Sequence, residues 1–205
     1  MKYKLLFCGL LALAVPAAIF GKLPADEKFT APKNAVILVI RHAEKPDTGH
    51  TLSAAGDARA QAYVNYFKDY QVDGQPLKLD YLFATADSGN SHRPRLTLEP
   101  FAKALGLKID SLFKATQFLQ LAQEIQNHPP GTNILICWHH GQIPQLLRAL
   151  GADPKHILPD GKWPEAEFGW LIQLRYDGSG HLVESKRINE NLPPEPPAKP
   201  TPAAP

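Results

Sequence analysis

Continuous hydrophobic runs mark the strands that this sequence predicts. Residues 34–40 and 133–138 are apolar and rich in β-branched side chains, without the alternation of a half-buried strand, so we expect strands buried on both faces. Residues 81–84 and 107–109 predict two shorter strands. Residues 170–176 and 181–185 alternate around Asp177-Gly178-Ser179-Gly180, which predicts a β-hairpin near the end of the chain.

Apolar residues at helical spacing occupy most of the segments between these strands. They predict helices over 52–70, 94–105, 115–127 and 143–150. Thr51 or Ser53 could cap the first helix, and Gly106 and Gly151 are placed to end the second and the fourth. Strands and helices alternate along the chain and a hairpin follows them, which predicts an α/β protein. We expect a three-layer α/β/α sandwich whose sheet is mostly parallel with an antiparallel edge.

The two ends of the chain have a different composition from this predicted domain. Lys2 and Lys4 precede an uncharged apolar run over 5–20, so we expect residues 1–21 to be a secretory signal peptide and the protein to be exported, periplasmic or secreted. An uncleaved membrane anchor is the alternative, but the run is short for a span and contains Pro16. Residues 191–205 are rich in proline and predict an extended or disordered tail, which leaves residues 22–190 as one domain.

Charge and cysteine content narrow the classes of function. Loss of residues 1–21 would leave 20 basic and 20 acidic residues, because only Lys2 and Lys4 are removed. A net charge of zero argues against a nucleic-acid-binding protein, so any anion must be recognised by arginines placed locally. Cys8 lies in the predicted signal peptide and Cys137 in an apolar run, so we expect no disulfide framework.

Basic and imidazole side chains follow directly after the two most hydrophobic strands. The first strand runs into Arg41-His42, and the strand over 133–138 runs into His139-His140. The carboxyl ends of parallel strands meet at one edge of the sheet, which is where open α/β sheets bind ligands. We therefore expect histidines from both strands to face one crevice.

A third contribution comes from the start of the helix predicted over 94–105. Arg93 enters this helix through Pro94, and a helix N-terminus favours an anion. Arg41 and Arg93 would supply two guanidinium groups to the crevice, as in sites that hold a phosphoryl group. Arg95 could do the same, although we expect it to be solvated.

Four segments, in order, resemble the histidine phosphatase superfamily, which includes the phosphoglycerate mutases. Arg41-His42-Ala43-Glu44 is similar to the Arg-His-Gly-Glu signature, with alanine in place of glycine. Leu52 to Ala60 is similar to the segment Leu-Ser/Thr-x-x-Gly-x-x-Arg/Gln-Ala. Arg93 to Thr97 is similar to the helix start Arg-Ala-x-x-Thr, and Ile134 to Gly141 is similar to the strand before the second histidine. The resemblance covers about residues 34–150 and implies a phosphoglycerate mutase-like fold.

The resemblance also implies an activity, that of a phosphoric monoester hydrolase. His42 would attack phosphorus and form a phosphohistidine, while Arg41, Arg93 and a second histidine bind the phosphoryl oxygens. Expected substrates are small phosphorylated compounds or a phosphoprotein, with neither nucleic acid nor, after signal cleavage, membrane as a partner. A mutase is disfavoured because the chain has no segment for a large cap.

Two assignments stay open at this stage. The second histidine is His139 or His140, and we favour His140 because it forms the common His-Gly pair, with His139 flanking the pocket. The acid that protonates the leaving group has no clear place: Gly141 stands where some relatives have an acid, Asp87 is a candidate, and Glu44 is better suited to orient the site. The absence of a strong acid would suit substrates with good leaving groups, such as acyl phosphates or phosphohistidine.

Two other interpretations of these residues compete with a metal-independent enzyme. A zinc site built from His42, His50, His139 and His140 is disfavoured because their spacing matches no zinc motif, so we expect neither metal nor cofactor. A catalytically weak or inactive module that binds a phosphate ligand or a protein through the same fold is the alternative to an enzyme. His50, Trp138 and Trp163 could line such a pocket or pack in the core.

Overall fold

The computed structural model describes residues 29–192 of the chain. The predicted signal peptide and residues 193–205 of the predicted tail lie outside the described residues. The strands are β1 (Val36–Arg41), β2 (Gln71–Val72), β3 (Gln75–Pro76), β4 (Tyr81–Ala84), β5 (Ile109–Asp110), β6 (Asn133–Trp138), β7 (Trp170–Tyr176) and β8 (Leu182–Asn189). The helices are α1 (Ala54–Lys68), α2 (Arg93–Leu105), α3 (Phe118–Gln126), α4 (Ile143–Ala149) and α5 (Pro154–Ile157), with 3₁₀ turns η1 (His140–Gln142) and η2 (Pro159–Gly161).

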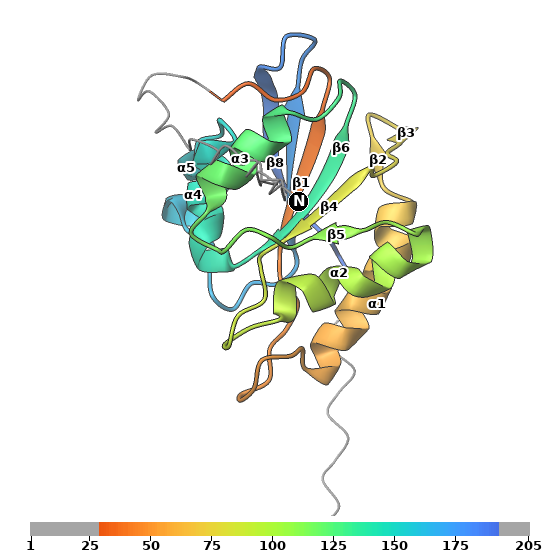
Figure 1. Ribbon diagram of the computed structural model, residues 1–205, viewed down its shortest axis with the longest axis vertical. Coiled ribbons are helices and arrows are strands. Elements are labelled where there is room, and N and C mark those ends of the chain that lie inside the picture. The colour runs from red at the N-terminus through yellow and green to blue at the C-terminus, as the bar shows by residue number, and fades with distance from the viewer. Residues whose placement is uncertain (1–28, 193–205) are drawn as a thin grey trace, which may run out of the picture.

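Six strands form one mixed sheet in the order β5-β4-β6-β1-β7-β8. The strands from β5 to β1 are parallel to their neighbours, and β7 and β8 add an antiparallel edge. Helices cover both faces of this sheet (Figure 1). The predicted three-layer α/β/α sandwich, mostly parallel with an antiparallel edge, is confirmed.

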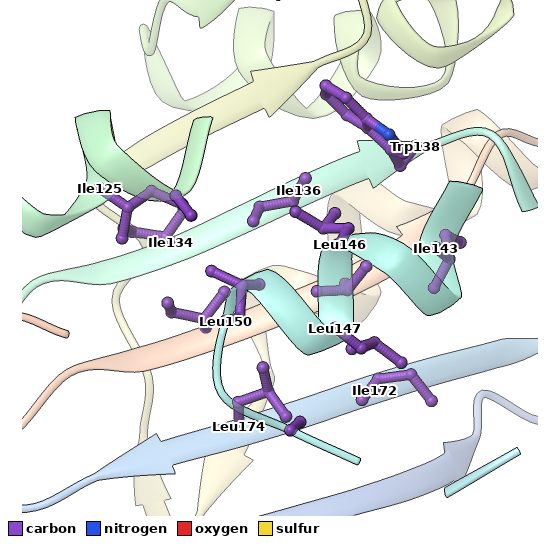
Figure 2. Close-up of a cluster of buried hydrophobic side chains, with 14 of the residues drawn as sticks. Ile125, Ile134, Ile136, Trp138, Ile143, Leu146, Leu147, Leu150, Ile172 and Leu174 are labelled. Carbon is purple, nitrogen blue, oxygen red and sulfur yellow. The ribbon is translucent and has the colours of Figure 1, made fainter. Parts of the chain in front are cut away.

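Burial on both faces explains why the central strands are continuously hydrophobic. In β1, Ile37 and Val39 pack into the core beneath α3 and α4, whereas Leu38 and Ile40 pack into the core beneath α1 and α2. Figure 2 shows the first of these cores, in which leucines of α4 cover isoleucines of β6 and β7. Both cores hold the central strands β1 and β6, and the ends of these strands carry the candidate site.

The predicted helix boundaries differ from the observed ones by a few residues, and their terminal residues explain where they end. Ser53 caps α1 by accepting a hydrogen bond from the Gly56 amide. Gly106 ends α2 in the left-handed region at φ 68°, where a Cβ would be strained. Within residues 29–192, no helix is long and apolar enough to span a membrane.

Candidate active site

The nucleophile candidate His42 extends the pairing of β1 with β6 by one residue. Arg41 is in register with Trp138, and the His42 amide donates to the Trp138 carbonyl oxygen at 3.1 Å. The Nδ1–H of His42 donates to the Ala43 carbonyl oxygen at 2.7 Å. This bond fixes the tautomer, so that Nε2 carries the lone pair. His42 is buried and is therefore held in one orientation.

The second imidazole beside His42 belongs to His139. The two ring centroids are 5.3 Å apart and the rings meet edge to face at 71°. The register explains this placement: since Arg41 pairs with Trp138, the next residues along the two strands are His42 and His139. His140 instead begins the turn η1, and its Nδ1 accepts a hydrogen bond of 3.4 Å from Arg41 Nη2. The geometry thus places His139, rather than the favoured His140, next to the nucleophile candidate.

The two arginines predicted from the sequence both contribute charge at this site. Arg41 is buried, and Arg93 acts electrostatically on both His42 and His139. Arg93 is oriented by the Gly49 carbonyl oxygen at 3.1 Å and the Asn90 carbonyl oxygen at 3.3 Å. The Nε atoms of Arg41 and Arg93 are buried and have no hydrogen-bond partner among residues 29–192. Two buried guanidinium donors without an acceptor make the site suited to an anion.

Burial and positive charge determine the protonation of the two histidines. Burial, together with Arg41, His139 and Arg93, lowers the pKa of His42 to about 3. Burial, together with Arg93, lowers the pKa of His139 to about 4. Both imidazoles are therefore neutral near pH 7, and His42 Nε2 is available as a nucleophile.

Glu44 is held by the segment from Ser53 to Arg59 on α1. Arg59 Nε donates to both carboxylate oxygens of Glu44 at 3.0 Å, and the Ser53 amide donates to the Glu44 carbonyl oxygen. Gly56 packs so closely that a Cβ there would collide with the same carbonyl oxygen. Glu44 therefore fixes the loop after His42 to α1, which agrees with a role in orienting the site.

A buried carboxylate that follows β8 joins this contact. Glu190 accepts from Arg59 Nη1 at 3.1 Å and from the Tyr63 hydroxyl at 3.0 Å. Burial raises the pKa of Glu190 to about 7 despite the nearby guanidinium. Arg59 is shared by two carboxylates and is oriented mainly toward Glu44, so it offsets only part of the cost of burying Glu190.

Thr97 on α2 supports the nucleophile loop from a third direction. Its hydroxyl accepts from the Ala43 amide at 2.9 Å and donates to the Arg93 carbonyl oxygen at 2.8 Å. The methyl group of Ala43, where the resembling family has glycine, packs with Leu52 and Ala60 in a small buried cluster. One hydroxyl thus couples the loop after β1 to the start of α2.

The remaining predicted residues lie farther from this arrangement or in the core. The Asp87 carboxylate pairs with Arg95 at 2.9 Å. His50 is exposed on the loop that orients Arg93, and its carbonyl oxygen accepts from the His92 amide. Trp138 and Trp163 are buried in the hydrophobic core. Within residues 29–192, no group of three histidine, cysteine or acidic side chains is arranged to hold a metal ion.

Sequence reasoning assigned no role to Arg59, Phe168 or Glu190. Arg59 lies within a quoted motif, and Gly56 and Arg59 follow Ser53 at intervals of three residues on α1, a spacing that places them on one helix face. Phe168 and Glu190 lie far along the chain and carry no local motif. Their contacts with the site arise only when β7 and β8 pair beside β1.

The arrangement of the sheet, with the site at the carboxyl ends of β1 and β6, defines a phosphoglycerate mutase-like α/β fold. Among solved structures, the chain is similar to phosphoglycerate mutase from Bacillus anthracis, with a TM-score of 0.51 and 12% identity over 76% of this chain and 93% of that one. It is also similar to phosphoglycerate mutase from Plasmodium falciparum, with a TM-score of 0.50 and 18% identity over 80% of this chain and 97% of that one. No protein-family model matches the sequence. No curated protein matches it either.

Proposed function

We propose that this chain is a phosphatase that hydrolyses phosphomonoesters through a phosphohistidine at His42. The observation that carries the proposal is the arrangement of His42, whose Nδ1–H is held by the Ala43 carbonyl oxygen while two buried arginine Nε donors lack an acceptor among the described residues. A neutral imidazole with a fixed tautomer suits nucleophilic attack, and the guanidinium groups suit the equatorial phosphoryl oxygens.

The proposed reaction has two steps. His42 Nε2 attacks phosphorus, the bond from phosphorus to the ester oxygen breaks, and the leaving oxygen takes up a proton. Water then attacks the phosphohistidine, the bond from nitrogen to phosphorus breaks, and inorganic phosphate leaves. Arg41, Arg93 and His139 offset the charge that develops on the phosphoryl oxygens in both steps. Because the guanidinium groups supply this charge, the proposed reaction needs no metal ion.

His139 is the better candidate for the second histidine on geometric grounds. Its ring contacts that of His42, whereas His140 lies against Arg41. A bound phosphate dianion would oppose the positive charge of the arginines and so favour the imidazolium form of His139 in the complex. We assign His140 to orienting Arg41.

One observation favours the weaker alternative, a module that binds a phosphate ligand with little or no turnover. The carboxylate of Asp87, a candidate for the general acid, is held by Arg95. Without a strong acid, leaving groups that need protonation would react slowly. The enzyme would then act best on acyl phosphates or phosphohistidine, and the module would only bind.

Turnover of p-nitrophenyl phosphate and of a panel of phosphomonoesters tests the proposal. We expect hydrolysis by the wild type, and a loss of about 10³-fold or more in His42→Ala, since the nucleophile is removed. Brief exposure to ³²P-labelled substrate should label the wild type with an acid-labile, base-stable phosphoryl group. EDTA should leave the rate unchanged.

An exposed histidine that contacts none of the site residues named above provides the control. His156 on α5 has an exposed side chain, so His156→Ala should hydrolyse the panel at the rate of the wild type. Equal phosphate release by the wild type and His42→Ala across the whole panel would refute the enzyme. Tight phosphate binding without turnover would establish the binding module instead.

We also propose that the protein is exported, on the basis of the charged head and apolar run in residues 1–21. Amino-terminal sequencing of the protein from its native cells is the direct test. A mature chain that begins near residue 22 agrees with export, and an intact amino terminus would contradict signal cleavage.

A further inference from the structure

The segment 163–169, which leads from η2 into β7, is fixed by its own hydrogen bonds. Trp163 Nε1 donates to the Glu167 carbonyl oxygen at 2.9 Å, and the Gly169 amide donates to Glu167 Oε1 at 2.7 Å. At its far end, the Gly169 carbonyl oxygen accepts from the Glu190 amide at 2.8 Å. The segment is therefore an ordered part of the molecule and holds its side chains in defined places.

Arg41 binds this segment through one nitrogen atom of its guanidinium group. Its Nη1 donates to the carbonyl oxygens of Glu165 at 2.6 Å and Glu167 at 2.7 Å. The guanidinium carbon also lies 3.7 Å from the centroid of the Phe168 ring, which stacks over it. Nη1 is thus bound by the segment and Nη2 by His140, whereas Nε is buried and has no partner among residues 29–192.

Phe168 connects this stack to the nucleophile. Its ring centroid is 6.3 Å from that of His42, in an edge-to-face arrangement at 62°. The same ring lines an open hollow of about 460 Å³ together with Lys45 and Glu165, whose side chains form an ion pair at 3.3 Å. One aromatic side chain thus contacts Arg41, lies beside His42 and also lines this hollow.

We propose that the Phe168 ring forms a wall of the site that limits the size of the group attached to phosphorus. Arg41 holds this wall in place and is therefore a positioning residue for Phe168 as well as a ligand of the phosphoryl group. The inference rests on the proposed function, since it concerns the same site. A ring fixed beside the nucleophile leaves room for a compact, unbranched substituent on phosphorus. A bulky aryl substituent would have to displace Phe168, which its stack on Arg41 resists. The substrates would therefore carry a compact substituent, such as the acetyl group of acetyl phosphate, and p-nitrophenyl phosphate, whose aryl group is bulky, would be hydrolysed slowly.

Stable phosphonates test this without any need for turnover. Calorimetric titration of the full-length wild type with methylphosphonate and benzylphosphonate should show that methylphosphonate binds more tightly, by about 1.4 kcal/mol or tenfold. Phe168→Ala should reduce this preference at least several-fold, mainly through tighter binding of benzylphosphonate. Phe168→Leu should give an intermediate preference, and it remains informative if the alanine variant does not fold.

Arg41→Lys separates the two roles of Arg41. Lysine keeps the positive charge but cannot donate to two carbonyl oxygens from a planar group that also stacks on an aromatic ring. We expect Arg41→Lys to retain methylphosphonate binding in weakened form and to lose the preference against benzylphosphonate. Phe29→Ala is the matched control, because Phe29 is also half-buried and packs against Tyr176 rather than any site residue. It should keep the preference of the wild type.

Each other outcome excludes a specific part of the inference. An unchanged preference in both Phe168 variants refutes the wall. Suppose that the Phe168 variants change the preference. If Arg41→Lys then keeps the preference of the wild type, or binds neither phosphonate, the positioning role of Arg41 is refuted. Failure of the wild type to bind phosphate or either phosphonate would overturn the proposed function itself, and the wall with it.

Discussion

His139 and His140 are adjacent in the chain but have different partners. The His139 ring contacts His42, and burial lowers its pKa to about 4. The His140 ring instead accepts a hydrogen bond from Arg41. We expect His139→Ala to reduce kcat for p-nitrophenyl phosphate by about 10²-fold or more, because it removes the proposed second donor to the phosphoryl oxygens. His140→Ala should reduce kcat by about tenfold at most.

Steady-state kinetics of both variants measure this difference. Circular dichroism of each variant provides the control for folding. A larger loss of kcat in His140→Ala than in His139→Ala would restore His140 as the second histidine, as favoured from the sequence.

The low pKa of His42 makes the stability of the fold sensitive to acid. In the folded protein this pKa is about 3, against a usual value of 6.5, so the unfolded chain binds more protons between those values. The free energy of unfolding should therefore decrease as the pH falls below 6.5. Between pH 7 and pH 5, His42 should account for a loss of about 2 kcal/mol.

Urea titrations at both pH values test this, with His42→Asn as the comparison. Asparagine does not titrate, so His42→Asn should lose about 2 kcal/mol less than the wild type over the same interval. Parallel losses in the two proteins would show that His42 is not buried in the neutral form.

At the scale of the elements, the approach of α1 to the nucleophile loop depends on one glycine. A Cβ at Gly56 would collide with the carbonyl oxygen of Glu44, a backbone atom that cannot rotate away. Gly56→Ala should therefore lower the free energy of unfolding by about 1–3 kcal/mol and reduce kcat, because the loop carrying His42 must shift. Gly89→Ala is the control, since a Cβ there meets no atom within 4 Å. Equal stabilities of the two variants would contradict the close approach.

The join between α2 and the nucleophile loop rests on the Thr97 hydroxyl. Thr97→Val keeps the shape of the side chain but leaves the buried Ala43 amide without its acceptor. We expect a loss of about 1–3 kcal/mol in the free energy of unfolding, and a lower kcat from misplacement of His42. Thr97→Ser, which restores the hydroxyl, should recover most of kcat. Failure of serine to do so would assign the effect to packing of the methyl group.

The hydrophobic pattern was sufficient to predict the large elements, because the helices bury one face at helical spacing and the central strands are buried on both faces. The short strands β2 and β3 were missed, since Gln71–Val72 and Gln75–Pro76 are largely exposed and carry no such pattern. Which of His139 and His140 lies beside His42 depends on register, because Arg41 pairs with Trp138 and the next residues along the strands are His42 and His139; local spacing does not contain that information. Contacts made by Phe168 and Glu190 depend on β7 and β8 returning beside β1, so no local motif could predict them.

On the scale of the whole molecule, Glu190 connects the end of β8 to the loop that carries His42. This buried carboxylate follows β8, and through Arg59 it is joined to Glu44 two residues after His42. Tyr63 adds a second donor from α1. One guanidinium group, that of Arg59, therefore connects the residue after β8, α1 and the loop after His42. A change of charge at Glu190 should alter the electrostatic environment of that loop.

Glu190→Gln should reveal this connection through its pH dependence. In the folded protein the pKa of Glu190 is about 7, above its usual 4.5, so the folded state holds a proton that the unfolded chain releases at lower pH. The contribution of Glu190 to stability is therefore present below pH 4.5 and decreases as the pH rises through 7. Glutamine does not titrate, so between pH 5 and pH 8 the variant should gain about 2–3 kcal/mol relative to the wild type. Glu124→Gln, at an exposed position of α3, corrects for the loss of one negative charge. If denaturant titrations give the wild type and Glu190→Gln parallel pH profiles, Glu190 carries its charge throughout this range, and Arg59 must then fully compensate both carboxylates.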